Sequence, residues 1–522
     1  MRLARATVAL ALVAAAPPPD PVAIPVTVAS AIDDHQAGRL IVFARKVEPG
    51  AKPDMEIDAT SFGAAEVSVA AREVQDLGGG KVALVDGESD SFPAPFSSLP
   101  PGIYRLQAVL DRNHDYNYSG RGAGDLVSDV VEVALPGPIP ALALTRALPA
   151  PSESDLLARL DSRDRAALAP YLAQIHRVDF VSPALSAFWA RPIHIQGWIA
   201  RPPGYRANGP RFPTAYSTSG FGSTDFTSRV SAARMMEAMA SSGYPPMLWV
   251  FLDENSATGT HEFADSANNG PWGQALTAEL IPALERQYRM DARPSGRFLT
   301  GHSSGGWASL WLQVRYPQIF GGSWPTAPDP SDFHDFVNAD LYAPDANVYR
   351  NDAGIATAVM RDNGKVLATF AQFARTEAVL GAYGGQFASF EWVFSPRGPD
   401  GRPMPMFDRT TGDVDPEVVA YWRDHYDIAH IVQRDWATLR PDLDGKIHLI
   451  VGTADTFYLD GPAHRLKAVL DGLGAKSDFR FVPDRTHGNL LRVGNDPEGL
   501  VKTIAWEMYA VARPGTKLRA SQ

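Results

Sequence analysis

The sequence contains no cysteine, which excludes disulfide bonds, thiolate metal sites and a thiol nucleophile. Beyond its N-terminus it has no apolar run of about eighteen residues, so we expect no membrane span in the mature protein. Its 48 Lys and Arg are outnumbered by 59 Asp and Glu, for a formal net charge of −11, and form no basic stripe. Nucleic acid is therefore not expected as a partner.

The N-terminus has the form of a secretory signal. Arg2 and Arg5 precede an apolar stretch from Ala6 to Ala16, which is followed by prolines and is too short to span a bilayer. Pro17 would suit signal peptidase poorly, so a cut near residue 29 is the alternative. We expect residues 1–29 to be a signal peptide and the protein to be periplasmic or secreted.

The length of 522 residues predicts two domains. In residues 30–148, short β-rich runs alternate with Gly, Pro and Asp clusters, which predicts an all-β, immunoglobulin-like sandwich domain. Residues 149–176 are proline-rich and then helical, so we interpret them as a linker. Residues 177–522 alternate strand and helix patterns, as in an α/β domain with a mostly parallel sheet.

Seven β-rich runs are candidate strands of that sheet. They are residues 193–200, 212–219, 247–253, 297–301, 321–327, 446–452 and 479–483. The segment 328–444 interrupts this rhythm and is rich in aromatic and acidic residues. A segment of that length between core strands predicts a lid with its own helices or a substrate-binding cap.

The sharpest local motif is Gly301-His302-Ser303-Ser304-Gly305, which follows a β-rich run and precedes a helical one. This is the strand-turn-helix context of a nucleophile elbow, where small residues permit a tight turn and a close strand-helix approach. Ser303 would stand at a helix N-terminus, which favours a developing anion. An ordinary Gly/Ser turn is the alternative.

A serine hydroxyl needs a base to take its proton and an acid to orient that base. In the α/β-hydrolase fold the chain order is Ser, Asp or Glu, then His. Asp455 follows the strand run at 446–452, and His487 follows the run at 479–483. The order and the strand ends predict a triad of Ser303, Asp455 and His487.

Three neighbours compete for these roles. Asp460 lies close to Asp455 but farther from the strand end. His464 also follows the Asp455 strand, but it falls in an amphipathic helical pattern. His302, inside the elbow, is interpreted as a packing or hydrogen-bonding residue rather than a second base.

Acyl transfer also requires donors to the oxyanion. One is expected from the backbone amide of Ser304, the residue after the nucleophile. The other is expected from the glycine-rich turn after the strand run at 212–219, with Phe221 as first candidate and Gly220 as second. A glycine turn without this role is the alternative.

Two stretches carry a family resemblance: TGTHEFADSANNGPWGQALTAELIPALERQYRM and RFLTGHSSGGWASLWLQVRYPQIFGGSWPTAP. They resemble the putative esterase family of α/β-hydrolases, which includes S-formylglutathione hydrolase (esterase D), enterochelin-type esterases and feruloyl esterases. The resemblance implies an α/β-hydrolase fold, hydrolysis of carboxylic esters, no cofactor, and triad roles on Ser303, Asp455 and His487. Enterochelin-type members also carry an N-terminal β-sandwich. The insertion at 328–444 and the exported, cysteine-free chain depart from the family.

Aromatic residues in the insertion and Trp272 in a GPWG turn suggest a pocket for a bulky, aromatic or sugar ester. For each single aromatic residue of the insertion, packing in the core of the cap is the competing interpretation. These residues are Phe333, Phe336, Tyr342, Phe390, Trp392 and Phe394.

The stretch from Asp111 to Asn117 has alternating oxygen ligands like those of a calcium loop. It lacks the glycine expected at position six, where Tyr116 stands, and the Glu expected at position twelve, where Gly122 stands. An Asx-rich turn is the more economical interpretation, and we predict no metal site.

The prediction is therefore an exported serine esterase that acts on a small-molecule ester. One alternative is a peptidase of the prolyl-oligopeptidase kind, although the N-terminal region is too short and unrepeated for the usual propeller. The other is an inert scaffold whose β domain binds a ligand or carbohydrate.

Overall fold

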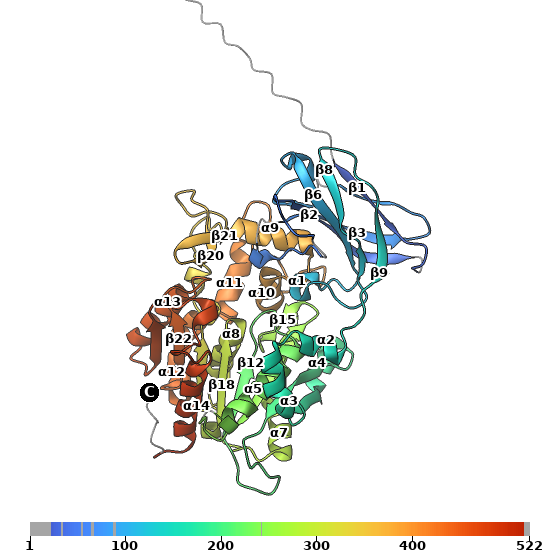
Figure 1. The fold of residues 1–522 in the computed structure, drawn as a ribbon. Coiled ribbons are helices and arrows are strands. Elements are labelled where there is room, and N and C mark those ends of the chain that lie inside the picture. Colours follow the sequence, from blue (N-terminus) through green and yellow to red (C-terminus); the bar gives the residue numbers. More distant parts are fainter. Residues whose placement is uncertain are drawn as a thin grey trace, which may run out of the picture.

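The computed structural model describes residues 22–32, 35–53, 56–63, 67–86, 90–241 and 243–515. An N-terminal region built of strands lies beside a larger α/β region (Figure 1). The α/β-hydrolase fold class expected from the sequence is confirmed. Within the described residues, no helix has the length and apolar character needed to cross a membrane.

The N-terminal strands form one continuous sheet of nine strands, in the order β4-β1-β9-β7-β6-β2-β3-β5, with β8 paired to β6. The strands are β1 (Ala23–Val28), β2 (Gln36–Lys46), β3 (Ser68–Leu77), β4 (Ala83–Asp86), β5 (Ser91–Phe92), β6 (Gly102–Asp111), β7 (Leu126–Ser128), β8 (Val131–Leu135) and β9 (Leu142–Ala147). Strands from both ends of this order share one hydrophobic core, which includes Ile24, Leu40, Leu106 and Leu142. The region is thus two layers linked through β9 and β7 rather than two separate sheets.

Strand β1 corrects one predicted boundary. It lies inside residues 1–29, yet it pairs with β4 and β9 and buries Ile24 and Val26 in the core. A segment that completes a sheet cannot be removed without exposing that core, so a cut at residue 29 is too late. The rest of the predicted signal segment, residues 1–21, lies outside the described residues.

The α/β region is built on an eight-stranded sheet in the order β10-β11-β13-β12-β18-β19-β22-β23. Its strands are β10 (His176–Val181), β11 (His194–Ala200), β12 (Thr214–Thr218), β13 (Leu248–Leu252), β18 (Arg297–His302), β19 (Gly322–Thr326), β22 (His448–Gly452) and β23 (Asp478–Val482). All pairings from β13 to β23 are parallel, whereas β11 is antiparallel to both of its neighbours. The seven predicted runs correspond to seven of these strands, and β10 at the edge was missed.

Helices cover both faces of this sheet because alternate strand residues point to opposite sides. In β13, Trp249 belongs to one hydrophobic cluster, while Leu248 and Val250 belong to the other. The helices outside the insertion are α1 (Tyr116–Ser119), α2 (Glu153–Ala158), α3 (Ser162–Leu172), α4 (Pro183–Trp189), α5 (Asp225–Ser241), α6 (Trp272–Gln274), α7 (Ile281–Gln287), α8 (Ser304–Arg315), α13 (Asp460–Gly472) and α14 (Gly499–Ala512).

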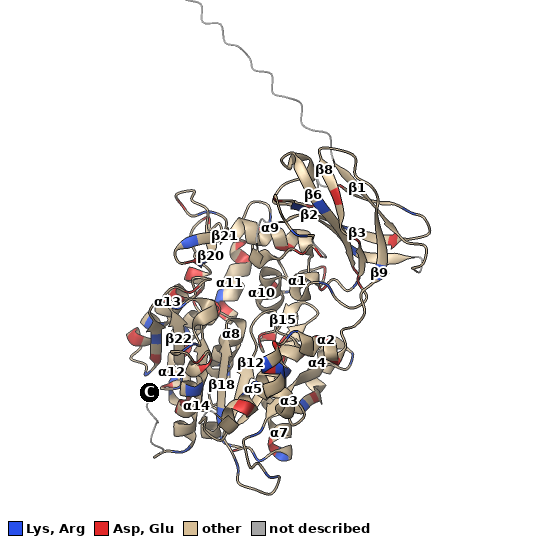
Figure 2. Cartoon of the chain, viewed as in Figure 1, with Lys and Arg blue, Asp and Glu red and all other residues tan. Residues whose placement is uncertain are grey.

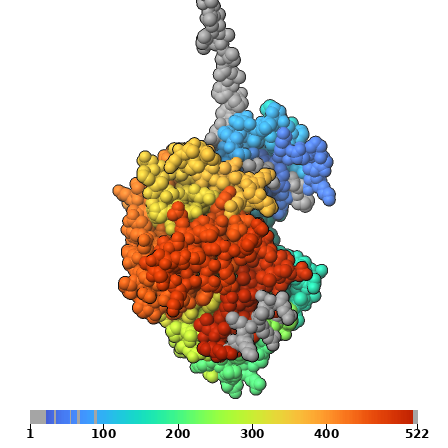
Figure 3. Space-filling model, turned by 90° about the vertical axis from the view of Figure 1, so that its left-hand side faces the viewer, coloured from blue at the N-terminus to red at the C-terminus, as the bar shows by residue number. Residues whose placement is uncertain are grey.

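The insertion at 328–444 contains a β-hairpin, four α-helices and a short 3-10 helix at Phe333–Asp335. The strands and α-helices are β20 (Ala358–Asp362), β21 (Lys365–Thr369), α9 (Phe370–Leu380), α10 (Gln386–Phe394), α11 (Pro416–His425) and α12 (Ile428–Leu443). The insertion, yellow to orange, lies against the blue N-terminal region and the red C-terminal segment (Figure 3). Acidic and basic residues are interspersed over both regions (Figure 2).

Candidate active site

Ser303 lies between β18 and α8 in strained backbone, with φ 61° and ψ −128°. The turn is tight because strand and helix nearly touch. A Cβ added at Gly301 would lie 2.1 Å from the carbonyl oxygen of Gly305, and one at Gly305 would lie 2.4 Å from that of Thr218. The glycines of the predicted elbow are therefore sterically required, and they present Ser303 at the N-terminus of a twelve-residue helix.

Five parallel strands bring candidate groups to one edge of the sheet. Strands β12, β18, β19, β22 and β23 run in the same direction, so the residues that follow them meet at their carboxyl ends. These residues are Gly220 and Phe221, Ser303, Asp329, Asp455 and His487.

His487 and Asp455, which lie far from Ser303 in the sequence, are in direct contact with each other. His487 Nδ1 lies 2.9 Å from Asp455 Oδ2. The Asp455 carboxylate is fully buried, and its other oxygen accepts the backbone N–H groups of Phe457, at 2.9 Å, and Leu459, at 3.3 Å. These bonds fix the carboxylate, and a proton on Nδ1 leaves the opposite nitrogen of His487 free to act as a base.

His487 and Ser303 line the same cavity. The Ser303 hydroxyl donates to Asp329 Oδ1 over 3.5 Å, a long and therefore weak hydrogen bond. Proton transfer from Ser303 to His487 requires the hydroxyl to turn from Asp329 towards the imidazole.

The competing side chains have other partners. Asp460 forms an ion pair with Arg361 at 2.8 Å. The His464 ring stacks on Phe481, with ring centroids 3.7 Å apart. His302 Nδ1 lies 3.1 Å from Thr326 Oγ1, and burial lowers the pKa of His302 to about 3, so this ring is neutral and serves as packing against His487.

Asp329 is a functional candidate that the sequence analysis missed. It is buried, accepts a hydrogen bond from Ser304 Oγ at 2.6 Å, and lies 3.4 Å from Gln386 Nε2. Burial raises the pKa of Asp329 to about 6. Its position just past the strand run at 321–327 is a usable signal, but the predicted insertion begins at residue 328 and includes it.

The predicted oxyanion donors lie around Ser303. Ser304 is the first residue of α8, where backbone N–H groups have no partner within the helix. Gly220 and Phe221 line the cavity with Ser303. A Cβ on Gly220 would lie 3.5 Å from the Ser303 Cβ, so a glycine here allows the loop to approach Ser303.

The cavity has a volume of about 260 Å³ and a mostly apolar wall. Its aromatic members come from four separate segments of the chain: Phe62, Phe221, Phe373, Phe387, Phe390 and Phe457. Of the aromatic residues singled out in the insertion, Phe390 lines this cavity. Phe333, Phe336 and Phe394 instead pack around the buried Trp422 in the core of the cap.

Trp272 does not line the cavity that contains Ser303, which corrects its predicted contact with substrate. It is buried, stacks on His261 with ring centroids 3.5 Å apart, and donates from its indole to the carbonyl of Asn269. Its ring borders a separate and larger cleft of about 1080 Å³. The GPWG turn marks a packed corner, because one face of the ring is covered by His261 and its indole N–H is already bonded.

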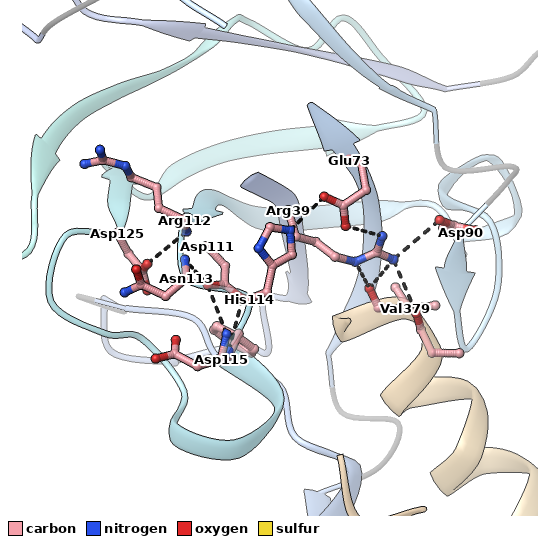
Figure 4. Close-up of polar contacts among 12 residues, drawn as sticks. Arg39, Glu73, Asp90, Asp111, Arg112, Asn113, His114, Asp115, Asp125 and Val379 are labelled. Carbon is pink, nitrogen blue, oxygen red and sulfur yellow. Dashed lines mark hydrogen bonds and ion pairs between the residues drawn. The ribbon is translucent and has the colours of Figure 1, made fainter. Parts of the chain in front are cut away.

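The calcium-like stretch brings together the carboxylates of Asp111, Asp115 and Asp125 (Figure 4). Asp111 accepts backbone N–H groups from Asn113, Asp115 and Tyr116, the pattern of an Asx-rich turn. The Asn117 amide points elsewhere and bonds the carbonyls of Glu377 and Gly381. The loop thus organises its own backbone and contacts the insertion.

A serine at a strained elbow, in one cavity with a histidine bound to a buried aspartate, is typical of serine hydrolases of the α/β-hydrolase fold. The chain belongs to the putative esterase family, whose model matches residues 190–463. It is a carboxylic ester hydrolase of the serine-esterase type.

Solved structures that this chain resembles include a ferulic acid esterase, which is 13% identical and has a TM-score of 0.36; the match covers 65% of this chain and 98% of that one. An S-formylglutathione hydrolase from Agrobacterium tumefaciens is 13% identical, with a TM-score of 0.36 and coverage of 65% and 94%. A ferulic acid esterase from Anaeromyces mucronatus is 11% identical, with a TM-score of 0.33 and coverage of 63% and 89%. No curated protein matches the chain.

Proposed function

We propose that the protein is an exported serine esterase in which Ser303 is the nucleophile, His487 the general base and Asp455 the acid that orients His487. The observation that carries this proposal is the 2.9 Å contact between His487 and Asp455 beside a cavity that His487 shares with Ser303. Each of the three residues follows a strand of the same sheet, so their relative positions depend on the rigid core and not on a loop alone.

In the first half-reaction, Ser303 Oγ attacks the ester carbonyl carbon while His487 takes the hydroxyl proton. Asp455 stays ionised and stabilises the imidazolium. The tetrahedral intermediate then collapses, the bond to the alcohol oxygen breaks, and His487 returns the proton to the departing alcohol. A water molecule, deprotonated by His487, cleaves the acyl-serine and releases the carboxylic acid.

The negative oxygen of each intermediate is stabilised by backbone N–H groups of Ser304 and Phe221, with Gly220 as the alternative to Phe221. The N-terminal end of α8 adds a favourable dipole. The substrate is an ester with an apolar, bulky acyl group, such as a hydroxycinnamoyl group. The aromatic wall of the cavity supports this choice, because apolar groups bind where they displace water from apolar surface.

Labelling with a fluorophosphonate tests the nucleophile. We expect intact mass to increase by one adduct that maps to Ser303 by peptide sequencing, and Ser303→Ala to remain unlabelled. Ser303→Ala and His487→Ala should each lower kcat for p-nitrophenyl acetate by at least about a thousand-fold.

The same preparations separate the alternatives. An inert scaffold would neither be labelled nor hydrolyse any ester. A peptidase would cleave a prolyl or alanyl anilide at a rate comparable with the ester, whereas a serine esterase would leave the anilide intact. Adduct formation on another serine would overturn the assignment of Ser303.

Export is proposed from the N-terminal sequence, with Arg2 and Arg5 ahead of the apolar stretch. Expression of the full chain in a Gram-negative host should place the ester hydrolase activity in the periplasmic fraction. Deletion of residues 1–21, which leaves β1 intact, should retain that activity in the cytoplasm, and equal distribution of both forms would contradict export.

A further inference from the structure

We propose that the N-terminal β region completes the acyl pocket by supplying Phe62, and that Phe62 gives the enzyme its preference for bulky apolar acyl groups. The inference rests on the proposed function and deepens it, because it assigns substrate selectivity to a residue outside the α/β-hydrolase fold. Phe62 lies in a 3-10 turn, Ser61–Gly63, between β2 and β3.

The Phe62 ring lies where three other segments meet. Its centroid is 6.0 Å from that of Phe221, in the proposed oxyanion loop, and 5.0 Å from that of Phe373, on α9 of the insertion. It is 5.9 Å from Phe457, next to the acid loop, and the contacts with Phe373 and Phe457 are edge-on. Such aromatic pairs favour one ring orientation, so Phe62 is held in place as a wall of the cavity that contains Ser303.

Phe62 is 37% exposed although its side chain is large and apolar. Much of a pocket wall stays in contact with solvent until a ligand covers it. An apolar acyl group that enters the cavity would bury this surface, and the hydrophobic gain scales with the area removed from water. A short acyl group would reach less of the wall and gain less.

A second residue of the N-terminal region supports the oxyanion loop. The ring of Tyr118, on α1, meets Phe221 edge-on with centroids 5.0 Å apart. Its hydroxyl donates to the carbonyl of Ser223 at 3.0 Å. The loop is thus held at both its side chain and its backbone by a residue from the other region.

The two regions are joined by buried polar contacts and not only by apolar packing. The Arg39 guanidinium, on β2, donates to the carbonyl of Val379 from Nε at 3.0 Å and from Nη2 at 2.8 Å (Figure 4). Asn117 donates to the carbonyls of Glu377 and Gly381. These carbonyls belong to the last turn of α9 and the residue after it, where most helix carbonyls lack partners within the helix and a cation is favourable. The Glu377 carbonyl also accepts the backbone N–H of Gly381. The N-terminal region therefore fixes the helix that carries Phe373, and Phe62 is positioned against it.

The test compares two exposed phenylalanines in the full-length chain. Phe62→Ala removes the proposed wall. Phe188→Ala is the matched control, because Phe188 is 39% exposed but does not line the cavity. For each variant, kcat and KM are measured with p-nitrophenyl acetate and p-nitrophenyl cinnamate, and binding of the neutral, uncleaved cinnamamide is measured by calorimetry.

Phe62→Ala should lower kcat/KM for the cinnamate ester by about ten-fold relative to the acetate ester, mainly through KM, and should weaken cinnamamide binding by a similar factor. Phe188→Ala should change neither ratio nor binding. An unchanged cinnamate-to-acetate ratio in Phe62→Ala, or the same change in Phe188→Ala, would overturn the inference.

Failure of the proposed function gives a different result. If the wild-type protein hydrolyses neither ester, the esterase proposal fails, and the cinnamamide measurement alone decides the role of Phe62. Binding that weakens in Phe62→Ala but not in Phe188→Ala would then support a pocket wall, whereas equal binding, or no binding to the wild type, would reject it.

Discussion

Asp329 places a buried carboxylate beside the hydroxyl of Ser303 and near the imidazole of His487. The negative charge of Asp329 destabilises the oxyanion but stabilises the imidazolium. The hydrogen bond that Asp329 accepts from Ser304 Oγ holds its carboxylate at the edge of the site. We expect the second effect to dominate, so Asp329→Asn should lower kcat about ten-fold at pH 8, equivalent to about 1.4 kcal/mol. The pKa of Asp329, raised to about 6 by burial, means that this charge is lost as the pH falls through that value.

The ratio of wild-type to Asp329→Asn kcat should therefore approach one below pH 5. This ratio would be measured with p-nitrophenyl acetate, in stopped or continuous assays over a buffer series of constant ionic strength. Asp460→Asn is a control, because Asp460 is paired with Arg361 rather than with the serine. A ratio that stays constant from pH 5 to pH 8 would reduce Asp329 to a structural role.

At this scale, the sequence predicts residues whose position follows from a strand end. That reasoning selected Asp455 and His487, which lie in contact in the structure. The same reasoning did not identify Asp329, because the predicted insertion begins at residue 328, directly after the strand run at 321–327. Phe62 could not be found in this way. It belongs to the N-terminal region, and the packing of that region against the cavity cannot be predicted from a local sequence pattern.

Among the elements, α9 depends most on a distant part of the chain. Arg39 and Asn117 bind the carbonyls at its C-terminal end. Arg39→Met keeps the aliphatic stem but leaves buried carbonyls without a donor, which we expect to cost about 2–4 kcal/mol of unfolding free energy. Chemical denaturation, followed by the fluorescence of the tryptophans, would show the transition at a lower denaturant concentration.

Arg72→Met is the matched control for Arg39→Met. Arg72 lies on the neighbouring strand β3 and donates to the carbonyl of Leu84 at the exposed edge of the sheet. Its loss should change stability by no more than about 0.5 kcal/mol. Equal destabilisation by the two substitutions would mean that the contacts of Arg39 with α9 have no special weight.

The elements themselves are largely predictable where strands are buried. Seven runs of the sheet were identified because β-branched and aromatic residues cluster there between turn residues. Strand β10, with the sequence HRVDFV, was missed because an edge strand carries fewer apolar residues. The run RLIVFA in β2 does not alternate between apolar and polar residues, which indicates a strand buried on both faces. Ile41 and Phe43 face the insertion, while Leu40 and Val42 face the core of the N-terminal region.

For the whole molecule, the length and the change of pattern along the chain predicted two regions but not how they pack. Three of the side chains that make this contact, Arg39, Tyr118 and Phe62, look like ordinary strand and turn residues in the sequence. The continuous sheet of the N-terminal region was likewise missed, since the parallel pairing of β1 with β9 joins segments more than a hundred residues apart. Long-range pairing of this kind follows from the packed structure and not from local propensity.

Buried acids predict how the stability of the whole molecule depends on pH. Burial raises the pKa of Glu377 to about 7, and it raises the pKa values of Glu254 and Glu262 well above their ordinary range. Between pH 6 and pH 8 the native state therefore holds more protons than the unfolded chain, and the free energy of unfolding falls as the pH rises. His261 and His302, whose pKa values burial lowers to about 3, oppose this trend in the lower part of the range, because they are neutral in the native state while the unfolded chain still binds protons on its histidines near pH 6.5. The three buried carboxyls outnumber these two histidines, so the net trend keeps its sign.

Thermal unfolding at constant ionic strength should thus show a lower midpoint at pH 8 than at pH 6. Glu262 is the sharpest site for a variant, because neither of its buried oxygens has a hydrogen-bond partner among the described residues. Glu262→Gln removes one ionisation and should flatten the decline, whereas Glu417→Gln, at an exposed helix start, should shift the curve without changing its slope. A midpoint that rises from pH 6 to pH 8, or an equal slope in the two variants, would show that these carboxyls reach water in the native state.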